Sequence, residues 1–137
     1  MKQSDRTKQA SLEKDVASDD LVNPGLRTVF RIAQKWDLGN EDLLVLLGQP
    51  SRSTFFRWKA GNAAQASHDL IERLSYILGI YKSLHTLFSH DDVADAWVHQ
   101  PNDNPLFAGQ PPLARMLAGK VSDLYVVREH VDAARGW

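Results

Sequence analysis

The residues best suited to metal chemistry in this 137-residue chain lie between positions 85 and 92. His85, His90, Asp91 and Asp92 carry the right atoms, but their spacing fits no familiar ligand motif. Asp91 or Asp92 is better explained as the N-cap of a helix. Because the chain has no cysteine, it has no disulfide, no thiolate zinc site and no cysteine nucleophile. The sequence predicts no metal site and no cofactor.

Catalysis by a serine, histidine and aspartate is not indicated either. The nucleophile of such a site sits on a sharp turn between a strand and a helix, and the helical pattern described below supplies no strand for it. No glycine-rich phosphate loop is present. We therefore expect a binding protein with no catalytic residues of its own.

Residues 43–61 carry side chains suited to the groove of DNA. A short apolar helix, a turn at Gly48 and a second helix over residues 52–60 are typical of a helix-turn-helix. At about 100° per residue, Phe55 and Trp58 share a face and should pack inward. The candidate DNA-binding residues are Arg52, Ser53, Phe56, Arg57 and Lys59. Any surface helix has an outer polar face, so the pattern alone leaves DNA contact open. A unit this small would bind weakly, and a dimer reading two half-sites is expected.

The charge distribution is consistent with this interpretation. The net charge of −1 first argues against a nucleic-acid partner. Residues 24–66 nevertheless hold six basic and three acidic side chains, a net charge of +3, whereas residues 67–137 hold six basic and nine acidic ones, a net charge of −3. The basic part coincides with the three short predicted helices, where a phosphate-binding surface would be useful.

The C-terminal segment carries a second candidate surface. Arg128, Asp132 and Arg135 follow at i, i+4 and i+7 on one face of a helix, whose apolar stripe is formed by Leu124, Val127, Val131 and Ala134. Such a row is also what a solvated set of ion pairs looks like. The sequence given ends in Arg135-Gly136-Trp137. A terminal tryptophan either packs against its own domain or docks into a partner, and both alternatives remain open.

Helical spacing of apolar residues predicts the elements that position these side chains. Asn23-Pro24 is predicted to cap a first helix, and Gly39-Asn40 separates it from a short helix over residues 41–47. After the helix at 52–60, Ser67 caps a long helix in which Gly79 indicates a close helix contact. Three more helices are predicted, from residues 90–92 to Trp97, over residues 113–118, and from a cap at Ser122-Asp123 to about Arg135. The predicted fold class is all-α, with six or seven helices.

The same pattern divides the chain into three parts. Residues 1–23 are predicted to be flexible or loosely helical, residues 24–66 to form the helix-turn-helix region, and residues 67–137 to form the long helix and a C-terminal domain. No run of about 18 apolar residues could span a membrane. Met1–Arg6 lacks the apolar core of a secretory signal, so the cytoplasm is the expected location.

The C-terminal part resembles a known family. Residues 97–102 (WVHQPN), 105–113 (PLFAGQPPL), 116–119 (MLAG), 124–128 (LYVVR) and 131–137 (VDAARGW) look like the toxin-binding domain of the MbcA/ParS/Xre antitoxins. The preceding helix-turn-helix, ending in residues 57–61 (RWKAG), fits the Xre-like unit of the same architecture. The C-terminal string is specific, whereas the Arg-Trp-x-x-Gly element alone is weak.

The resemblance implies a type II antitoxin whose toxin has a RES domain and uses NAD, by consuming it or by transferring ADP-ribose. The antitoxin would cover the active site of this toxin with its C-terminal region and repress its own promoter, as a homodimer within the complex. Carried over by position, Arg128, Asp132, Arg135, Gly136 and Trp137 are the candidate toxin-binding residues. Whether the C-terminus inserts into the toxin or covers it as a lid is left open. The alternative is a stand-alone Xre-like transcriptional regulator.

Overall fold

The computed structural model describes residues 21–63 and 65–136, and this part of the chain contains helices and turns but no strand. Residues 21–35 are helical, and we call them the N-terminal helix. The other helices are α2 (Asn40–Leu46), α3 (Arg52–Lys59), α4 (His68–Leu87), α5 (Asp91–Ala96), the 3₁₀ turn Trp97–His99, α6 (Pro112–Met116) and α7 (Val121–Arg135). The all-α prediction is confirmed. Of the segment predicted to be flexible or loosely helical at residues 1–23, residues 21–23 are described and helical, and residues 1–20 lie outside the described residues.

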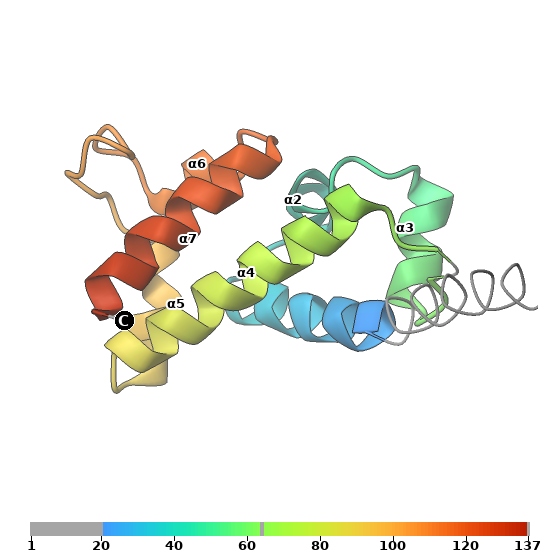
Figure 1. The fold of residues 1–137 in the computed structure, drawn as a ribbon, viewed down its shortest axis with the longest axis horizontal. Coiled ribbons are helices and arrows are strands. Elements are labelled where there is room, and N and C mark those ends of the chain that lie inside the picture. Colours follow the sequence, from blue (N-terminus) through green and yellow to red (C-terminus); the bar gives the residue numbers. More distant parts are fainter. Residues whose placement is uncertain (1–20, 64, 137) are drawn as a thin grey trace, which may run out of the picture.

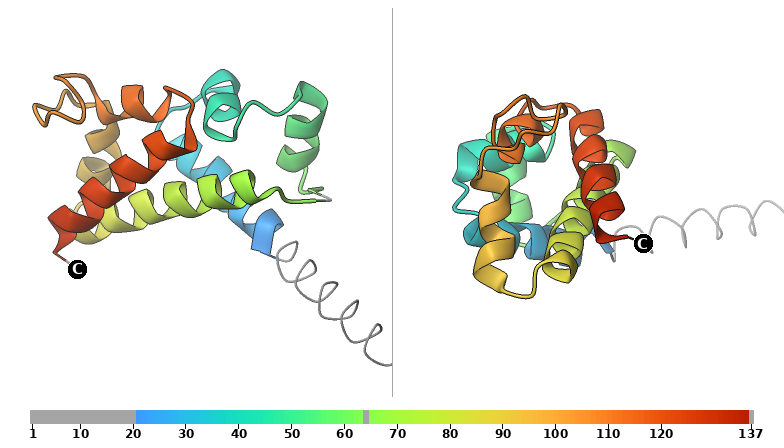
Figure 2. Two further views of the ribbon diagram at one scale, coloured as in Figure 1. Left: turned by 45° about the horizontal axis from the view of Figure 1, so that its top comes forward. Right: turned by 90° about the vertical axis from the view of Figure 1, so that its left-hand side faces the viewer.

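Helix α4 is the axis around which the other elements are arranged (Figure 1). The N-terminal helix crosses it on one side, and α7 packs along it on the other. Figure 2 shows the same arrangement from two other directions, with α3 and the end of α7 at opposite ends of the molecule. The DNA-binding and toxin-binding candidates are therefore far apart.

The ends of the two central helices are set by their capping residues. The Ser67 hydroxyl accepts a hydrogen bond from the backbone N–H of Leu70 at 3.1 Å, and the Ser51 hydroxyl accepts one from Thr54 at 3.2 Å. Each bond satisfies an N–H group that the helix itself leaves unpaired. Both caps, at the starts of α4 and α3, lie where the sequence predicts a helix to begin.

Two predicted caps are wrong, the first because a long-range contact replaces it and the second because the helix begins earlier than predicted. Asn23 lies inside the N-terminal helix, and its amide binds residue Ala63: Oδ1 accepts from the backbone N–H at 2.9 Å, and Nδ2 donates to the carbonyl at 3.4 Å. Helix α7 begins at Val121 after Lys120, and Asp123 accepts the Lys120 N–H at 3.1 Å from inside the first turn. Ala134 is exposed and does not belong to the apolar stripe.

Of the residues considered for a metal site, His85 and Asp91 are hydrogen-bonded to each other. His85 contacts Asp91 through Nδ1 at 3.1 Å and Asp95 through Nε2 at 2.8 Å. The N-cap residue of α5 is His90. Asp91 and Asp92 both lie in the first turn of the helix, so neither aspartate is the cap. These contacts fasten α5 to the end of α4.

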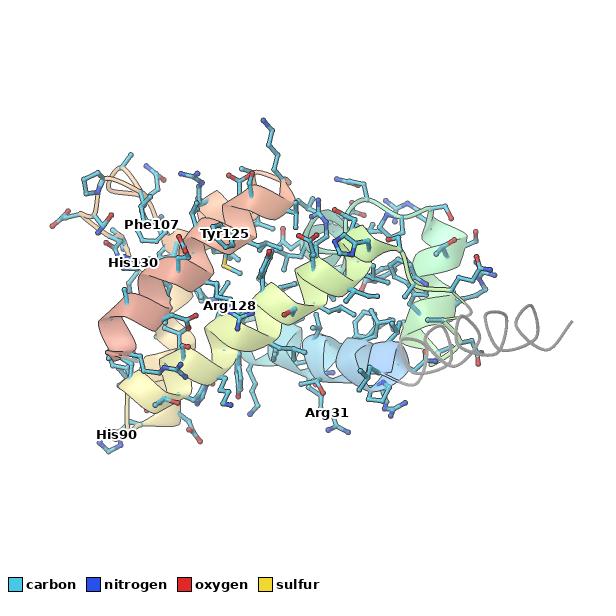
Figure 3. The ribbon with its side chains drawn as sticks, viewed as in Figure 1. Arg31, His90, Phe107, Tyr125, Arg128 and His130 are labelled. Atoms are coloured by element: carbon cyan, nitrogen blue, oxygen red, sulfur yellow. The ribbon has the colours of Figure 1, made fainter. Side chains whose placement is uncertain are left out.

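One hydrophobic core runs through the described residues, from Val22 in the N-terminal helix to Val131 in α7. Its C-terminal end is closed by an aromatic cluster of Trp97, Phe107 and His130. The His130 ring stacks on Trp97 at 6.1 Å and meets Phe107 edge-on at 5.3 Å between ring centroids. Figure 3 shows Phe107 and His130 side by side on the loop side of α7. The cluster holds the loop before α6 against this helix.

A buried arginine connects the two halves of the chain. The side chain of Arg73 in α4 is only 8% exposed, and its Nε donates to Asp69 at 2.8 Å. Nη1 donates to the Val45 and Leu46 carbonyls at the end of α2, at 3.4 Å each. Nη2 donates to the Gly119 carbonyl, just before α7, at 2.9 Å. The helix-turn-helix and the C-terminal helices are therefore joined through one guanidinium.

Candidate functional site

The helix-turn-helix is formed by α2, a turn over residues 47–51, and α3. Gly48 has a φ of +91°, which a residue without a Cβ adopts at little cost. A Cβ here would also lie 2.9 Å from a carboxylate oxygen of Asp69. The turn needs glycine both for its backbone conformation and for the close approach of α4.

The two faces of α3 are those that the sequence predicts. Phe55 is completely buried and contacts Phe30 of the N-terminal helix edge-on, with 5.8 Å between ring centroids. Trp58 is partly buried against the same core. Phe56 is 48% exposed. The other four candidate DNA-binding side chains, Arg52, Ser53, Arg57 and Lys59, are exposed as well.

The three basic side chains among these candidates already have polar partners. Arg52 pairs with Glu41 of α2, with 2.7 Å between Nη2 and Oε1. Lys59 Nζ donates to Asn40 Oδ1 at 3.0 Å, and Arg57 donates to the Thr54 hydroxyl at 3.2 Å. Exposed pairs of this kind contribute little to stability, so all three basic residues can exchange them for phosphate oxygens. Sequence reasoning missed Glu41 and Asn40, because nothing local indicates that α2 faces α3 through them.

The predicted C-terminal row divides into two parts. Arg128 and Asp132 face α4: Arg128 Nη1 donates to the carbonyl and to the hydroxyl of Ser75, both at 3.2 Å, and Asp132 accepts from the Ser83 hydroxyl. Arg128 Nε also contacts Asp132 at 3.4 Å. Figure 3 shows Arg128 directed from α7 toward α4. These two residues join the helices and are not a solvated row.

Gly79 makes this close contact possible. A Cβ at this position in α4 would lie 2.5 Å from Arg128 Nε. The close helix contact predicted at Gly79 is therefore present, and its partner is the Arg128 side chain.

The second part of the row lies at the end of α7. Arg135 is the last helical residue, and Gly136 ends the helix in the left-handed conformation, with a φ of +76°. Trp137 lies outside the described residues. Its two alternatives, packing on the chain or docking into a partner, stay as predictions.

A cavity of about 510 Å³ opens between α4 and α7 beside this row. Its lining consists of Tyr76, Tyr125, Arg128, Glu129, Asp132 and Ala133. Both tyrosines and Glu129 are residues that sequence reasoning missed. The sequence shows that Tyr125 and Glu129 are four residues apart on one helix. It does not show that Tyr76 of α4 lies opposite them.

The charged groups that line this cavity are two carboxylates, Glu129 and Asp132, and one guanidinium, Arg128. The Tyr125 hydroxyl donates to Glu129 at 2.7 Å, and this bond to the carboxylate raises the pKa of Tyr125. The pKa of Tyr76 is raised by burial first and then by Glu72, which accepts its hydroxyl at 3.3 Å. Both phenols donate a hydrogen bond to a carboxylate.

A second cavity, of about 470 Å³, lies between the N-terminal helix and α4. It is lined mainly by apolar side chains, among them Val22, Ile71, Leu74 and Leu78, with Leu21 at its edge. Leu21 is 74% exposed. Arg128 lies at the boundary of both cavities.

No helix in the described part of the chain is long and apolar enough to cross a membrane.

Comparison with known families gives two matches. Residues 19–79 match the antitoxin Xre-like helix-turn-helix domain, and residues 83–136 match the antitoxin Xre/MbcA/ParS C-terminal toxin-binding domain. The first match contains α2 and α3, and the second contains α5, α6 and α7.

A relative from Sinorhizobium fredii supports the same grouping of both halves in one chain. It is 49% identical over 112 residues, which cover 81% of this chain and 84% of the relative. The relative is described as uncharacterized protein y4oB. The shared region is longer than either family match alone.

Proposed function

Because the chain belongs to the Xre/MbcA/ParS family of type II antitoxins, we propose that it neutralises a RES-domain toxin that uses NAD. In this proposal the C-terminal region covers the active site of the toxin, and the helix-turn-helix represses the operon. The chain itself acts by binding, without catalysis. The NAD chemistry, whether NAD consumption or ADP-ribosyl transfer, belongs to the toxin. The observation that carries the proposal is the match of residues 83–136 to a toxin-binding domain.

The geometry supports a protein with two surfaces. Helix α3 and the end of α7 lie at opposite ends of the molecule (Figure 2). A toxin bound at Arg135, Gly136 and Trp137 would leave Arg52 and Arg57 accessible to DNA. The complex could then bind both partners in the cytoplasm, where an operator and NAD are found together.

The proposed toxin contact combines both parts of the C-terminal row. Arg135, Gly136 and Trp137 would contact the toxin directly, because Gly136 ends α7 and leads the chain away from it. Arg128 and Asp132 fix the direction of α7 through Ser75 and Ser83 and are themselves 35% and 19% exposed. They can therefore meet the toxin at the edge of the same surface. Aromatic and arginine side chains are the types that contribute most to protein interfaces.

The protein encoded by the reading frame adjacent to that of this chain is the probe for this proposal. Co-expression and purification should give a stable complex. The adjacent protein alone should consume NAD or transfer ADP-ribose, and adding this chain should stop the reaction. A neighbour that neither binds this chain nor uses NAD would contradict the proposal.

DNA binding by α3 is the second part of the proposal. Its support is the exposed basic face of α3 and the match of residues 19–79 to an Xre-like helix-turn-helix. A homodimer would place two such helices on two half-sites of an operator. A stand-alone regulator would share this property, so DNA binding alone does not separate the two functions; inhibition of a toxin does.

Replacing Arg52 and Arg57 by alanine should weaken binding to the promoter DNA of the operon. Each lost phosphate contact releases one counterion fewer, so the slope of log K against log salt should fall by about two for the double variant. Fluorescence anisotropy at several salt concentrations measures both effects. Lys82→Ala, an exposed cation on α4, is the matched control. An unchanged affinity and slope in the double variant would exclude α3 as the recognition helix.

A further inference from the structure

We propose that the cavity between Tyr76 and Tyr125 receives an arginine or lysine side chain of the toxin. The toxin-binding surface then extends from α7 onto α4, beyond the residues that match the toxin-binding domain. This inference rests on the proposed function, and it names a part of the toxin surface that the C-terminal row does not include.

Two aromatic rings form the walls of this site. The rings of Tyr76 and Tyr125 meet edge-to-face, with 5.6 Å between centroids and an angle of 63°. Tyr125 is 44% exposed, so its ring is accessible to a partner. Tyrosine loses little conformational entropy on binding and offers both a ring face and a hydroxyl, so exposed tyrosines beside a cavity are suited to contact a protein.

The charged groups around the two rings favour a positively charged side chain as the occupant of the cavity. Glu72 and Glu129 accept the two phenol hydroxyls, and Asp132 lines the same cavity. Arg128 is the one cation among these lining residues. The lining thus holds two carboxylates and one guanidinium, and Glu72, which contacts His68 at 2.6 Å, lies next to it. Burial is the main cause of the raised pKa of Tyr76, and the hydrogen bond to Glu129 is the main cause of the raised pKa of Tyr125, with the nearby carboxylate contributing in both cases.

Arg128 occupies only part of the site, because it lies over the ring of Tyr76 and leaves the ring of Tyr125 and the Glu129 carboxylate to a second cation. Its guanidinium donates to Ser75 and Asp132, and its central carbon lies 6.0 Å from the centroid of Tyr76. Glu129 accepts the Tyr125 hydroxyl, and no basic partner for it is found among the described residues. A second cation can therefore approach Glu129 and contact a tyrosine ring face, where the quadrupole attracts positive charge.

The position of the cavity favours the toxin over other cationic partners. Its α7 residues, Tyr125, Arg128, Glu129 and Asp132, belong to the segment matched by the toxin-binding domain. The same helix continues to Arg135 and Gly136, where the toxin contact is proposed. Tyr76 belongs to the segment matched by the helix-turn-helix domain, yet it faces Tyr125. The structure joins residues that the two sequence matches separate.

The test uses the full-length chain and the purified protein of the adjacent reading frame. We expect Tyr125→Ala, Tyr76→Ala and Glu129→Lys each to raise the Kd for this protein by roughly tenfold or more, as for other interface hot spots. Tyr125→Phe keeps the ring and should stay within about threefold of wild type, since it loses one hydrogen bond. Asp103→Lys, the same charge reversal on an exposed loop, is the control and should leave the Kd unchanged.

Thermal melts and promoter DNA binding of all variants should match wild type, which separates a lost contact from a lost fold. If Tyr76→Ala fails to fold, the exposed positions Tyr125 and Glu129 decide the question. Wild-type affinity in Tyr125→Ala and Glu129→Lys would overturn the inference and leave the proposed function standing. A loss in Tyr125→Ala without one in Glu129→Lys would overturn the cationic occupant. No binding by wild type would instead refute the proposed function.

Discussion

Replacing Arg73 by leucine should lower the free energy of unfolding by about 3 kcal/mol, because three backbone carbonyls would lose a charged donor in a buried position. Two of these carbonyls, those of Val45 and Leu46, end α2, and the third belongs to Gly119. Asp69 is half exposed, so its carboxylate can turn to water and adds little to the loss.

Urea denaturation followed by circular dichroism measures this effect. Arg31→Leu is the matched control, since Arg31 is exposed on the N-terminal helix and points to solvent (Figure 3). It should change the unfolding free energy by less than about 0.5 kcal/mol. A loss below about 1 kcal/mol for Arg73→Leu would show that the guanidinium does not hold the two halves together.

Removing residues 135–137 should abolish neutralisation of the toxin while leaving the chain folded. Arg135 and Gly136 lie beyond Val131, the last buried residue of α7. Removing residues 135–137 therefore removes the proposed toxin contact and little of the hydrophobic core. A cut at residue 128 would be a poorer test, because it also removes Val131 and the bonds of Arg128 and Asp132 to α4.

Survival of cells that express the protein of the adjacent reading frame measures neutralisation. Cells with the full-length chain should grow, and cells with the shortened chain should not. Promoter DNA binding and the melting temperature of the shortened chain are the controls, and both should stay close to wild type. Full rescue by the shortened chain would refute the role of its last three residues.

The helices could be predicted because their signals are local. Ser51 and Ser67 accept N–H groups three residues ahead, and the buried apolar residues of α4 recur at helical spacing. The inward position of Phe55 and the outward position of Arg57 follow from the same period. Local rules were sufficient for these residues.

The remaining features depend on residues far apart in the sequence. Asn23 binds Ala63, 40 positions away, and therefore does not act as a cap. The spacing of Arg128 and Asp132 fits both a solvated helix face and a face that contacts another helix. Their hydrogen bonds to α4 decide between these two alternatives. The site at Tyr76 and Tyr125 exists because two helices cross, which no pattern within either helix shows.

The physical organisation suggests how one small chain could serve two partners. Helix α4 carries Arg73 against the helix-turn-helix at one end and contacts Arg128 of α7 further along. Because both contacts are made by buried or partly buried guanidinium groups with several acceptors, the two surfaces should keep a fixed relation to each other. We expect toxin binding to α7 to leave the DNA-binding helix in place.

The most direct test of the central claim is an inhibition titration with purified proteins. NAD consumption or ADP-ribosyl transfer by the protein of the adjacent reading frame is measured while the full-length chain is added. We predict that the activity falls to background once the stoichiometry of the purified complex is reached, and that a chain lacking residues 135–137 leaves it unchanged. Activity that persists in an excess of the full-length chain would contradict the account.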